Sequence, residues 1–125
     1  MKFKAICENH LYAKAYAKGK KQVTPTVVVY VLKDRNAAVI TREDPLHRPW
    51  NRIGLTVSKK LGGAVVRNRV KRILREGYRQ LDRKTPVSRG NLIVLAARGA
   101  AARAKTAEIE KDLKRAFTAL GMLES

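Results

Sequence analysis

Basic side chains carry most of the chemistry that this sequence can offer. The chain of 125 residues holds 28 Lys and Arg against 10 Asp and Glu, which gives a formal net charge of +18. Twelve of these bases and only two of the acids fall within residues 48–84. Because 45% of the residues are hydrophobic, the chain can also bury a core, and a disordered basic tail is excluded. A folded domain with this charge indicates a polyanionic partner, and nucleic acid is the leading class.

The densest bases share one side of a predicted helix over residues 64–81. At about 100° per residue, Arg67, Lys71, Arg75 and Arg79 follow one another at successive turns, and the apolar residues fall on the other side. Like charges at this spacing repel each other, so a polyanion that covers the helix would stabilise it. The planar fork of arginine suits phosphate, and this side of the helix has few uncharged polar side chains that read base edges. The pattern favours binding to a phosphate backbone.

The residues that a self-contained nuclease would need are scattered along the chain. Hydrolysis of RNA by a protein takes clustered carboxylates for metal ions or a pair of histidines for acid–base catalysis. Only Glu43 and Asp44 are adjacent acids, and they fall in a proline-containing segment. His10 and His47 lie in different regions, and Cys7 with His10 makes only half of a zinc pattern. We therefore expect no catalytic residue and no metal site in this chain.

Apolar periodicity and turn-forming residues predict one domain over residues 1–125 that contains both helices and strands. The expected helices are 8–18, 64–81 and a last one from 106, and the expected strands are 27–32, 37–41, 52–58 and 92–97. The second strand would return from a tight turn at 34–36 to form a hairpin with the first, and a loop would fill 42–51. This order, α-β-β-β-α-β-α, predicts an α+β fold, an α/β sandwich with one sheet packed against helices.

The predicted strand over 52–58 has two unlike faces. Apolar residues alternate with small or polar ones: Ile53, Leu55 and Val57 on one face, and Arg52, Gly54, Thr56 and Ser58 on the other. Successive side chains of a strand point to opposite faces of the sheet, so this alternation predicts that one face packs on the core and the other stays polar.

Cysteine content and hydropathy indicate a cytoplasmic protein. Cys7 is the single cysteine, which excludes an internal disulfide and suits a reducing compartment. No apolar run reaches the roughly 18 residues of a membrane span, and the first residues lack the apolar stretch of a signal peptide. We therefore expect no membrane partner.

Two neighbouring segments closely resemble the signature of the bacterial ribonuclease P protein family. They are Asn51–Lys60, with the sequence NRIGLTVSKK, and Gly63–Arg72, with the sequence GAVVRNRVKR, followed by Arg75 and Glu76. The resemblance implies a fold related to the second domain of ribosomal protein S5. It also implies a left-handed strand–helix–strand crossover over 52–97, whereas general experience with such crossovers favours the right hand.

The resemblance further implies the function. Proteins of this family are the protein subunit of ribonuclease P, a ribonucleoprotein endoribonuclease. The subunit binds a large catalytic RNA and the 5′ leader of precursor tRNA, and the complex removes this leader to give the mature 5′ end. The RNA carries out the hydrolysis with Mg²⁺, which the RNA mainly holds. A monomer in a 1:1 complex with the RNA is expected.

The resemblance assigns two RNA contacts to residues of this chain. The basic helix and the lysines before it would dock on the catalytic RNA: Arg67, Asn68, Arg69, Lys71, Arg72, Arg75, Lys59 and Lys60. A cleft between the sheet and the N-terminal helix would take the single-stranded leader, lined by aromatic residues at the matching positions: Tyr12, Tyr16 and Tyr30. The polar face of the strand over 52–58 would form its floor: Arg52, Thr56 and Ser58. Tyrosine stands where the family often has phenylalanine, and the ring that stacks on bases is kept.

Two other classes of protein share part of this pattern. A ribosomal or other structural RNA-binding protein would have the same charge and fold class, but it would more often place its bases in disordered tails and needs no aromatic cleft. A sequence-specific DNA-binding protein would present a recognition helix with mixed polar side chains, usually as a dimer. Asn68 is the main side chain of that kind on the basic helix, which favours phosphate binding.

Overall fold

The computed structural model describes residues 3–6 and 8–123 of the chain. Five strands, four helices and two short 3₁₀ turns (η) follow one another along it. Their bounds are β1 Lys4–Ala5, α1 Asn9–Lys18, β2 Lys20–Val23, β3 Val27–Lys33, α2 Ala37–Glu43, β4 Arg52–Thr56, η1 Lys59–Leu61, α3 Ala64–Lys84, β5 Asn91–Ala97, η2 Gly99–Arg103 and α4 Thr106–Ala119. No helix in the described part of the chain is long and apolar enough to cross a membrane.

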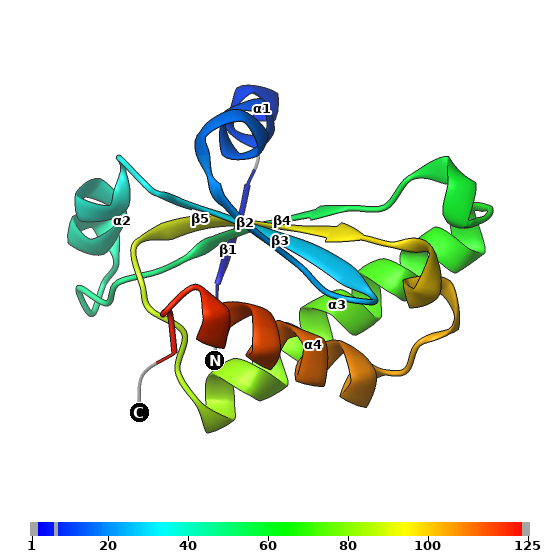
Figure 1. The fold of residues 1–125 in the computed structure, drawn as a ribbon. Coiled ribbons are helices and arrows are strands. Elements are labelled where there is room, and N and C mark those ends of the chain that lie inside the picture. Colours follow the sequence, from blue (N-terminus) through cyan, green and yellow to red (C-terminus); the bar gives the residue numbers. More distant parts are fainter. Residues whose placement is uncertain (1–2, 7, 124–125) are drawn as a thin grey trace.

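All five strands form one sheet in the order β1-β4-β5-β3-β2. The central strand β5 is parallel to β4 and antiparallel to β3, and β2 is antiparallel to β3 at one edge. Figure 1 shows α1 on one face of this sheet, α3 and α4 side by side on the other, and α2 at one end. The arrangement is the α/β sandwich that the sequence predicts.

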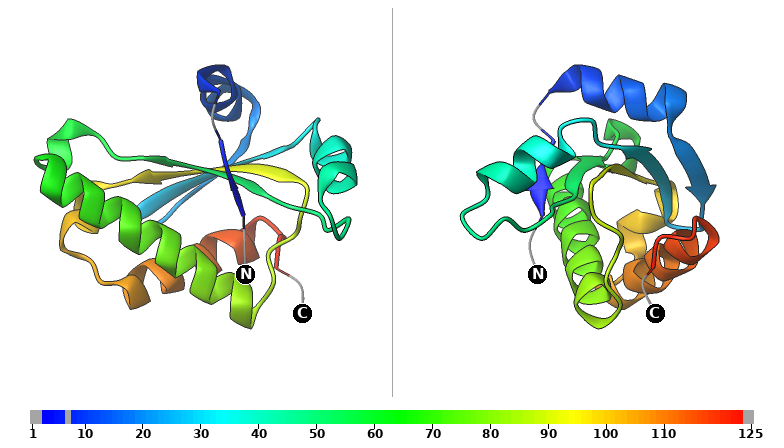
Figure 2. Two further views of the ribbon diagram at one scale, coloured as in Figure 1. Left: turned by 180° about the vertical axis from the view of Figure 1, so that it is seen from behind. Right: turned by 90° about the vertical axis from the view of Figure 1, so that its left-hand side faces the viewer.

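The crossover from β4 through α3 to β5 is left-handed. In Figure 1 β4 runs from α2 on the left toward the right, and α3 returns below the sheet. β1 lies at the back of that view and β2 at the front, as the two views of Figure 2 show, so β5 lies in front of β4. This geometry gives the hand that the family resemblance implies, and it is the opposite of the common one.

The main core lies between the sheet and the pair α3–α4. Its largest fully buried side chains come from these two helices and from β3 and β5, among them Tyr78, Leu74, Phe117, Ile93 and Leu95. The alternation predicted for β4 is confirmed on this side, because its apolar residues Ile53 and Leu55 pack against this core.

Gly77 lets α3 and α4 approach closely. A Cβ at this position would lie 2.8 Å from Cγ2 of Ile109 on α4 and 3.3 Å from the backbone nitrogen of Glu110. Contacts this short require a neighbour to move, so a residue without a side chain sets the spacing of the two helices.

The predicted strand over 37–41 is wrong: this segment forms helix α2. Asp34 accepts a hydrogen bond from the backbone N–H of Asn36 at 2.9 Å, and its carbonyl accepts one from Ala37, so the turn leads into a helix. Both edges of β3 are already occupied, by β5 and by β2, so no edge is left for a returning strand. The hairpin partner of β3 is β2, which begins in the basic run before it. The element order is therefore β-α-β-β-α-β-α-β-α and differs from the predicted order.

Candidate nucleic-acid interface

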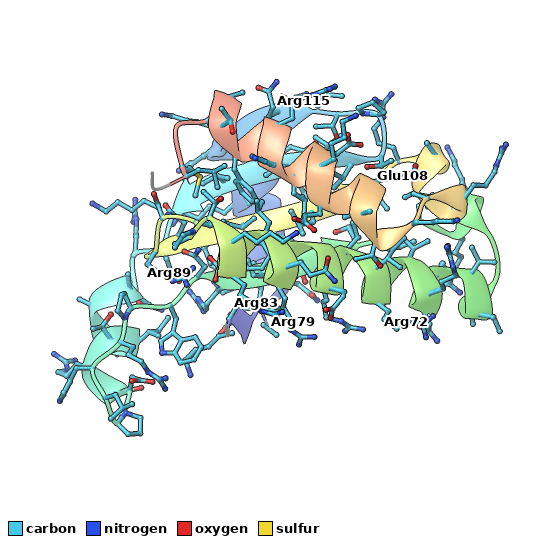
Figure 3. The ribbon with its side chains drawn as sticks, turned by 90° about the horizontal axis from the view of Figure 1, so that it is seen from below. Arg72, Arg79, Arg83, Arg89, Glu108 and Arg115 are labelled. Carbon is cyan, nitrogen blue, oxygen red and sulfur yellow. The ribbon has the colours of Figure 1, made fainter. Side chains whose placement is uncertain are left out.

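Helix α3 carries a continuous row of basic side chains along one side, partly buried at its first two members and exposed at the others. We call this row the basic strip: Arg67, Lys71, Arg72, Arg75, Arg79 and Arg83. From Arg67 to Arg83 the strip is about 24 Å long, since an α-helix rises about 1.5 Å per residue. Figure 3 shows Arg72, Arg79 and Arg83 on the same outer flank of α3. The strip extends one to two turns beyond Arg75, where the assignment by resemblance ends, and the continued four-residue spacing of bases is the signal for this extension.

The middle of the strip is available to a partner. Within the described residues, Lys71, Arg72 and Arg75 have no hydrogen bond or ion pair through their side chains. Arg79 lies 3.8 Å from Glu76, the one acid beside the strip, in a pair that is about half exposed on both sides. Such exposed pairs contribute little to stability, and a phosphate could readily replace the carboxylate.

Arg69 has an internal role. Its guanidinium donates hydrogen bonds to the carbonyl oxygens of Ala102 at 3.2 Å and Ala104 at 2.7 Å, which ties α3 to the η2 turn. Arg67 is half-buried, and its Nε has no hydrogen-bond partner among the described residues. Within the Arg-Asn-Arg segment, Arg69 therefore supports the fold, Arg67 is half-buried, and Asn68 is exposed to solvent.

The lysines before α3 extend the basic surface at its N-terminal end. Lys59 and Lys60 are exposed on η1, and the turn at Gly62, with φ of 145°, joins η1 to α3. The first turn of α3 contains no acidic residue. Helix N-termini favour anions, so this end of the helix and its lysines attract phosphate together.

Two tyrosines, one exposed and one partly buried, form an aromatic cluster on the opposite face of the sheet. The rings of Tyr16 on α1 and Tyr30 on β3 meet edge to face, with centroids 4.8 Å apart and planes at 84°. The hydroxyl of Tyr16 lies 2.7 Å from Oγ1 of Thr56 on β4 and shares a hydrogen bond with it. Tyr16 keeps 40% of its surface exposed, so it remains accessible to a partner.

Tyr12 lies one turn before Tyr16 and packs on the sheet. Its ring covers Gly54, where an added Cβ would come within 2.5 Å of Cε1 of the tyrosine. Tyr12 and Tyr30 both pack against a small second core under α1 that includes Ala15. The structure therefore brings the three predicted cleft tyrosines together between α1 and the sheet.

Among the residues predicted for the floor of the cleft, Arg52 is buried in a charge network. Its Nε and Nη2 donate hydrogen bonds to Asp34 at 2.6 and 2.8 Å, and its Nη1 lies 3.4 Å from Glu8. Burial acts to raise the pKa of Asp34, but the hydrogen bonds from Arg52 and from the Asn36 N–H outweigh it, so the pKa lies below its ordinary value. Ser58, by contrast, is exposed just beyond the end of β4.

Most buried carboxylates of the described chain are engaged in structural contacts. Asp44 accepts hydrogen bonds from the backbone N–H and guanidinium of Arg48 and from the indole of Trp50, which hold its pKa well below the usual range. Asp82 pairs with Arg89, and Asp112 accepts two hydrogen bonds from Thr26. In the described part of the chain, no group of three His, Cys, Asp or Glu residues is arranged to hold a metal ion. The described residues thus present two surfaces on opposite faces of the sheet, the basic strip of α3 and the tyrosine cluster under α1.

Comparison with known proteins identifies one family over nearly the whole chain. The model of the family described as Ribonuclease P matches residues 1–121. The ribonuclease P protein component of Bacillus cereus (strain 03BB102) is 36% identical over 117 residues, which cover 94% of this chain and 90% of that relative. That of Clostridium acetobutylicum is 33% identical over 123 residues, covering 98% and 93%.

Solved structures agree with this result. The RNase P protein of Staphylococcus aureus has a TM-score of 0.75 at 27% identity and covers 98% of this chain and 100% of its own. The RNase P protein of Thermotoga maritima, at 22% identity and a TM-score of 0.64, covers 83% of this chain and 86% of its own and shares the fold. These matches do not favour a ribosomal protein. The chain belongs to the ribonuclease P protein family, so it is the protein component of a tRNA-processing ribonucleoprotein endoribonuclease and its partner is a ribonuclease P RNA.

Proposed function

We propose that the protein binds two RNA molecules on two faces of its sheet: the catalytic RNA on the basic strip of α3, and the 5′ leader of precursor tRNA on the tyrosines between α1 and the sheet. The observation that carries this division is the contrast between the two surfaces. One is a row of six cations on α3, with a single aromatic ring, Phe3, beside Arg79. The other is a pair of tyrosine rings, of which Tyr16 is exposed and Tyr30 is partly buried. Phosphate backbones and unstacked bases are the respective partners that such surfaces fit.

The charge and accessibility of the strip support docking on structured RNA. The Lys71, Arg72 and Arg75 side chains make no hydrogen bond or ion pair with the described residues, and the neighbouring η1 lysines extend the surface. Binding would release counterions from the RNA, so it would weaken steeply as salt rises.

The tyrosine cluster supports binding of a single strand. A base in a duplex is stacked on its neighbours, but the bases of a single-stranded leader have open faces that an aromatic ring can cover. Tyr16 is the side chain best placed for this, since it is exposed and its ring is held by Tyr30 and Thr56. A ring already held in place loses little conformational entropy when a base stacks on it.

Hydrolysis would be the task of the catalytic RNA, with one copy of the protein per RNA. Mg²⁺ at the reacting phosphate would be held mainly by RNA oxygens, because the buried carboxylates Asp34, Asp44, Asp82 and Asp112 already have partners inside the protein. The protein would contribute affinity and orientation of the substrate.

The test is paired binding of precursor and mature tRNA to holoenzyme reconstituted with the catalytic RNA. Stacking contributes about 1–3 kcal/mol per base, so Tyr16→Ala should weaken affinity for precursor tRNA by roughly five- to a hundredfold. Affinity for mature tRNA, which lacks the leader, should stay the same. Tyr16→Phe is the comparison variant: it keeps the ring but loses the hydrogen bond to Thr56, so its loss of precursor affinity should be smaller than that of Tyr16→Ala. Equal losses for both substrates would contradict the proposal.

A further inference from the structure

Three residues at successive turns of α1 each contact a different residue of β4. Glu8, which directly precedes the helix, Tyr12 and Tyr16 are spaced four residues apart and therefore share one side of α1. Their partners are alternate residues of β4 on one face of the sheet: Arg52, Gly54 and Thr56. The three contacts differ in kind, being an ion pair, a close steric fit and a hydrogen bond.

The ion pair is part of a network that connects α1 to the end of β3. Arg52 reaches Glu8 with one nitrogen and holds Asp34 with two others. The positive charge of Lys14 on α1 also acts on Asp34. The side chains of Arg52 and Asp34 are 10% and 1% exposed. A leader phosphate would have to displace a buried carboxylate to gain Arg52, so this arginine is poorly suited to bind the substrate directly.

The steric fit sets how deeply the helix sits. The Tyr12 ring occupies the space where a side chain at position 54 would be, and its Cε1, Cζ and Oη would all lie within 2.7 Å of a Cβ added to Gly54. Real Cβ contacts are about 1 Å longer, so any residue except glycine must push the ring away from the sheet. Tyr12 and Tyr16 are on one helix, and a displaced Tyr12 therefore disturbs the hydrogen bond between Tyr16 and Thr56.

We infer that Arg52, Gly54 and Thr56 are positioning residues: they fix α1 over the sheet and so hold the tyrosines where the leader binds. The inference rests on the proposed function, which assigns the leader to this cleft. It differs from that proposal in giving the polar face of β4 a role through α1, without contact to the leader. The affinity for leader-containing substrate thus depends on Gly54, which acts because it lacks a side chain and leaves room for the Tyr12 ring.

The decisive variant is Gly54→Ala, with Gly99→Ala as its matched control. A Cβ at Gly99 meets no atom within 4 Å, so the control adds the same methyl group without a clash. In the free protein, NMR should show that Gly54→Ala loses the nuclear Overhauser contacts of the Tyr16 ring with the Thr56 methyl group and with Tyr30. In the holoenzyme it should weaken binding of precursor tRNA by roughly five- to a hundredfold, as loss of one stacked base does, and leave mature tRNA unaffected.

Two double-mutant cycles separate positioning from a general loss of stability. Gly54→Ala should have little further effect on precursor affinity when Tyr12 is already alanine, because no ring is left to displace. Thr56→Val should weaken precursor binding in the wild-type background but not with Tyr16→Phe, which has already lost the hydrogen bond. Thr56→Ser keeps the hydroxyl group and should therefore bind precursor tRNA as well as the wild type does.

The NMR and binding readouts distinguish this inference from the proposed function. If Gly54→Ala leaves the Tyr16 contacts in place, or if its effect is additive with Tyr12→Ala, the positioning role is overturned. If the contacts are lost and both tRNAs bind as before, the positioning of α1 stands and the assignment of the leader to this cleft fails. Loss of the contacts together with loss of precursor binding alone supports both.

Discussion

Three alanines in the middle of the basic strip give a quantitative test of the docking surface. Lys71, Arg72 and Arg75 have no side-chain hydrogen bond or ion pair within the described chain, so their removal leaves no buried partner unpaired. Each phosphate contact that is lost lowers the slope of log affinity against log salt by about 0.7–0.9. The triple variant should therefore have a slope smaller by about 2.1–2.7. Between about 50 and 200 mM salt, the wild type should lose about 20- to 40-fold more affinity than the variant.

The assay is titration of labelled catalytic RNA with protein at several salt concentrations. The matched control replaces three exposed bases of α4 by alanine: Lys111, Lys114 and Arg115. This control removes the same charge from another helix, and Figure 3 shows Arg115 on the flank of the molecule away from Arg72 and Arg79. It should lower the net charge without the large change in slope.

The triple-alanine variant of α3 should fold as well as the wild type. Alanine is the best helix former. Replacing these bases by alanine also removes the repulsion between like charges one turn apart, which destabilises a helix by about 0.2–0.5 kcal/mol per pair. Thermal unfolding of the protein alone checks this. Equal salt slopes for the α3 and α4 variants, with both folded, would refute the assignment of the strip and would indicate that the bases act through net charge only.

Three further predictions concern stability. Asp34→Asn should lower the free energy of unfolding by up to about 3–5 kcal/mol at neutral pH, because the buried Arg52 loses the carboxylate that holds two of its nitrogens and keeps the longer ion pair with Glu8. The folded-state pKa of Asp34 is lowered from 3.8, so this difference should persist above about pH 4 and shrink as the pH falls further, which urea unfolding across pH measures. Gly77→Ala should lower the free energy of unfolding by up to about 2 kcal/mol. Overpacking against α4 costs about 1–3 kcal/mol, and the higher helix propensity of alanine returns about 1 kcal/mol. Gly99→Ala should be close to neutral in the same denaturation assay. Burial raises the pKa of Tyr78 from 10.0 to about 12, so stability should fall as the pH rises between these values, and Tyr78→Phe should remove both this fall and the ultraviolet absorbance change near pH 12.

Local periodicity was sufficient to predict the long elements and the basic strip. The pattern of period 3.6 predicted α3, the alternation of period 2 predicted β4, and the continuous apolar run over 92–97 predicted β5. The predicted ends lie within about three residues of those observed. The position of a side chain around a helix follows from the geometry of the helix alone. The common outer flank of Arg72 and Arg79 could therefore be predicted without knowledge of the packing.

Short elements depended on the rest of the sheet. Residues 37–41 are apolar enough for either a strand or a helix, and they became α2 because β5 and β2 already flank β3. β2 lies within a run of lysines without a strand pattern, and its conformation is set by pairing with Tyr30 and its neighbours on β3. Strand pairing is a non-local interaction, so the residues of one segment do not contain it.

The partners of the arginines were decided by tertiary structure alone. The alternation of β4 correctly placed Arg52 on the face toward α1. It did not predict that Arg52 is buried there in an ion pair with Asp34, 18 residues earlier in the chain. Arg69 belongs to the Arg-Asn-Arg segment, yet it donates hydrogen bonds to carbonyl groups more than 30 residues later, in η2 and directly after it. The sequence determines which face of an element a charged side chain occupies. Whether that face meets solvent, RNA or another part of the protein depends on where distant segments return, because burial is a property of the packed chain and not of the local one.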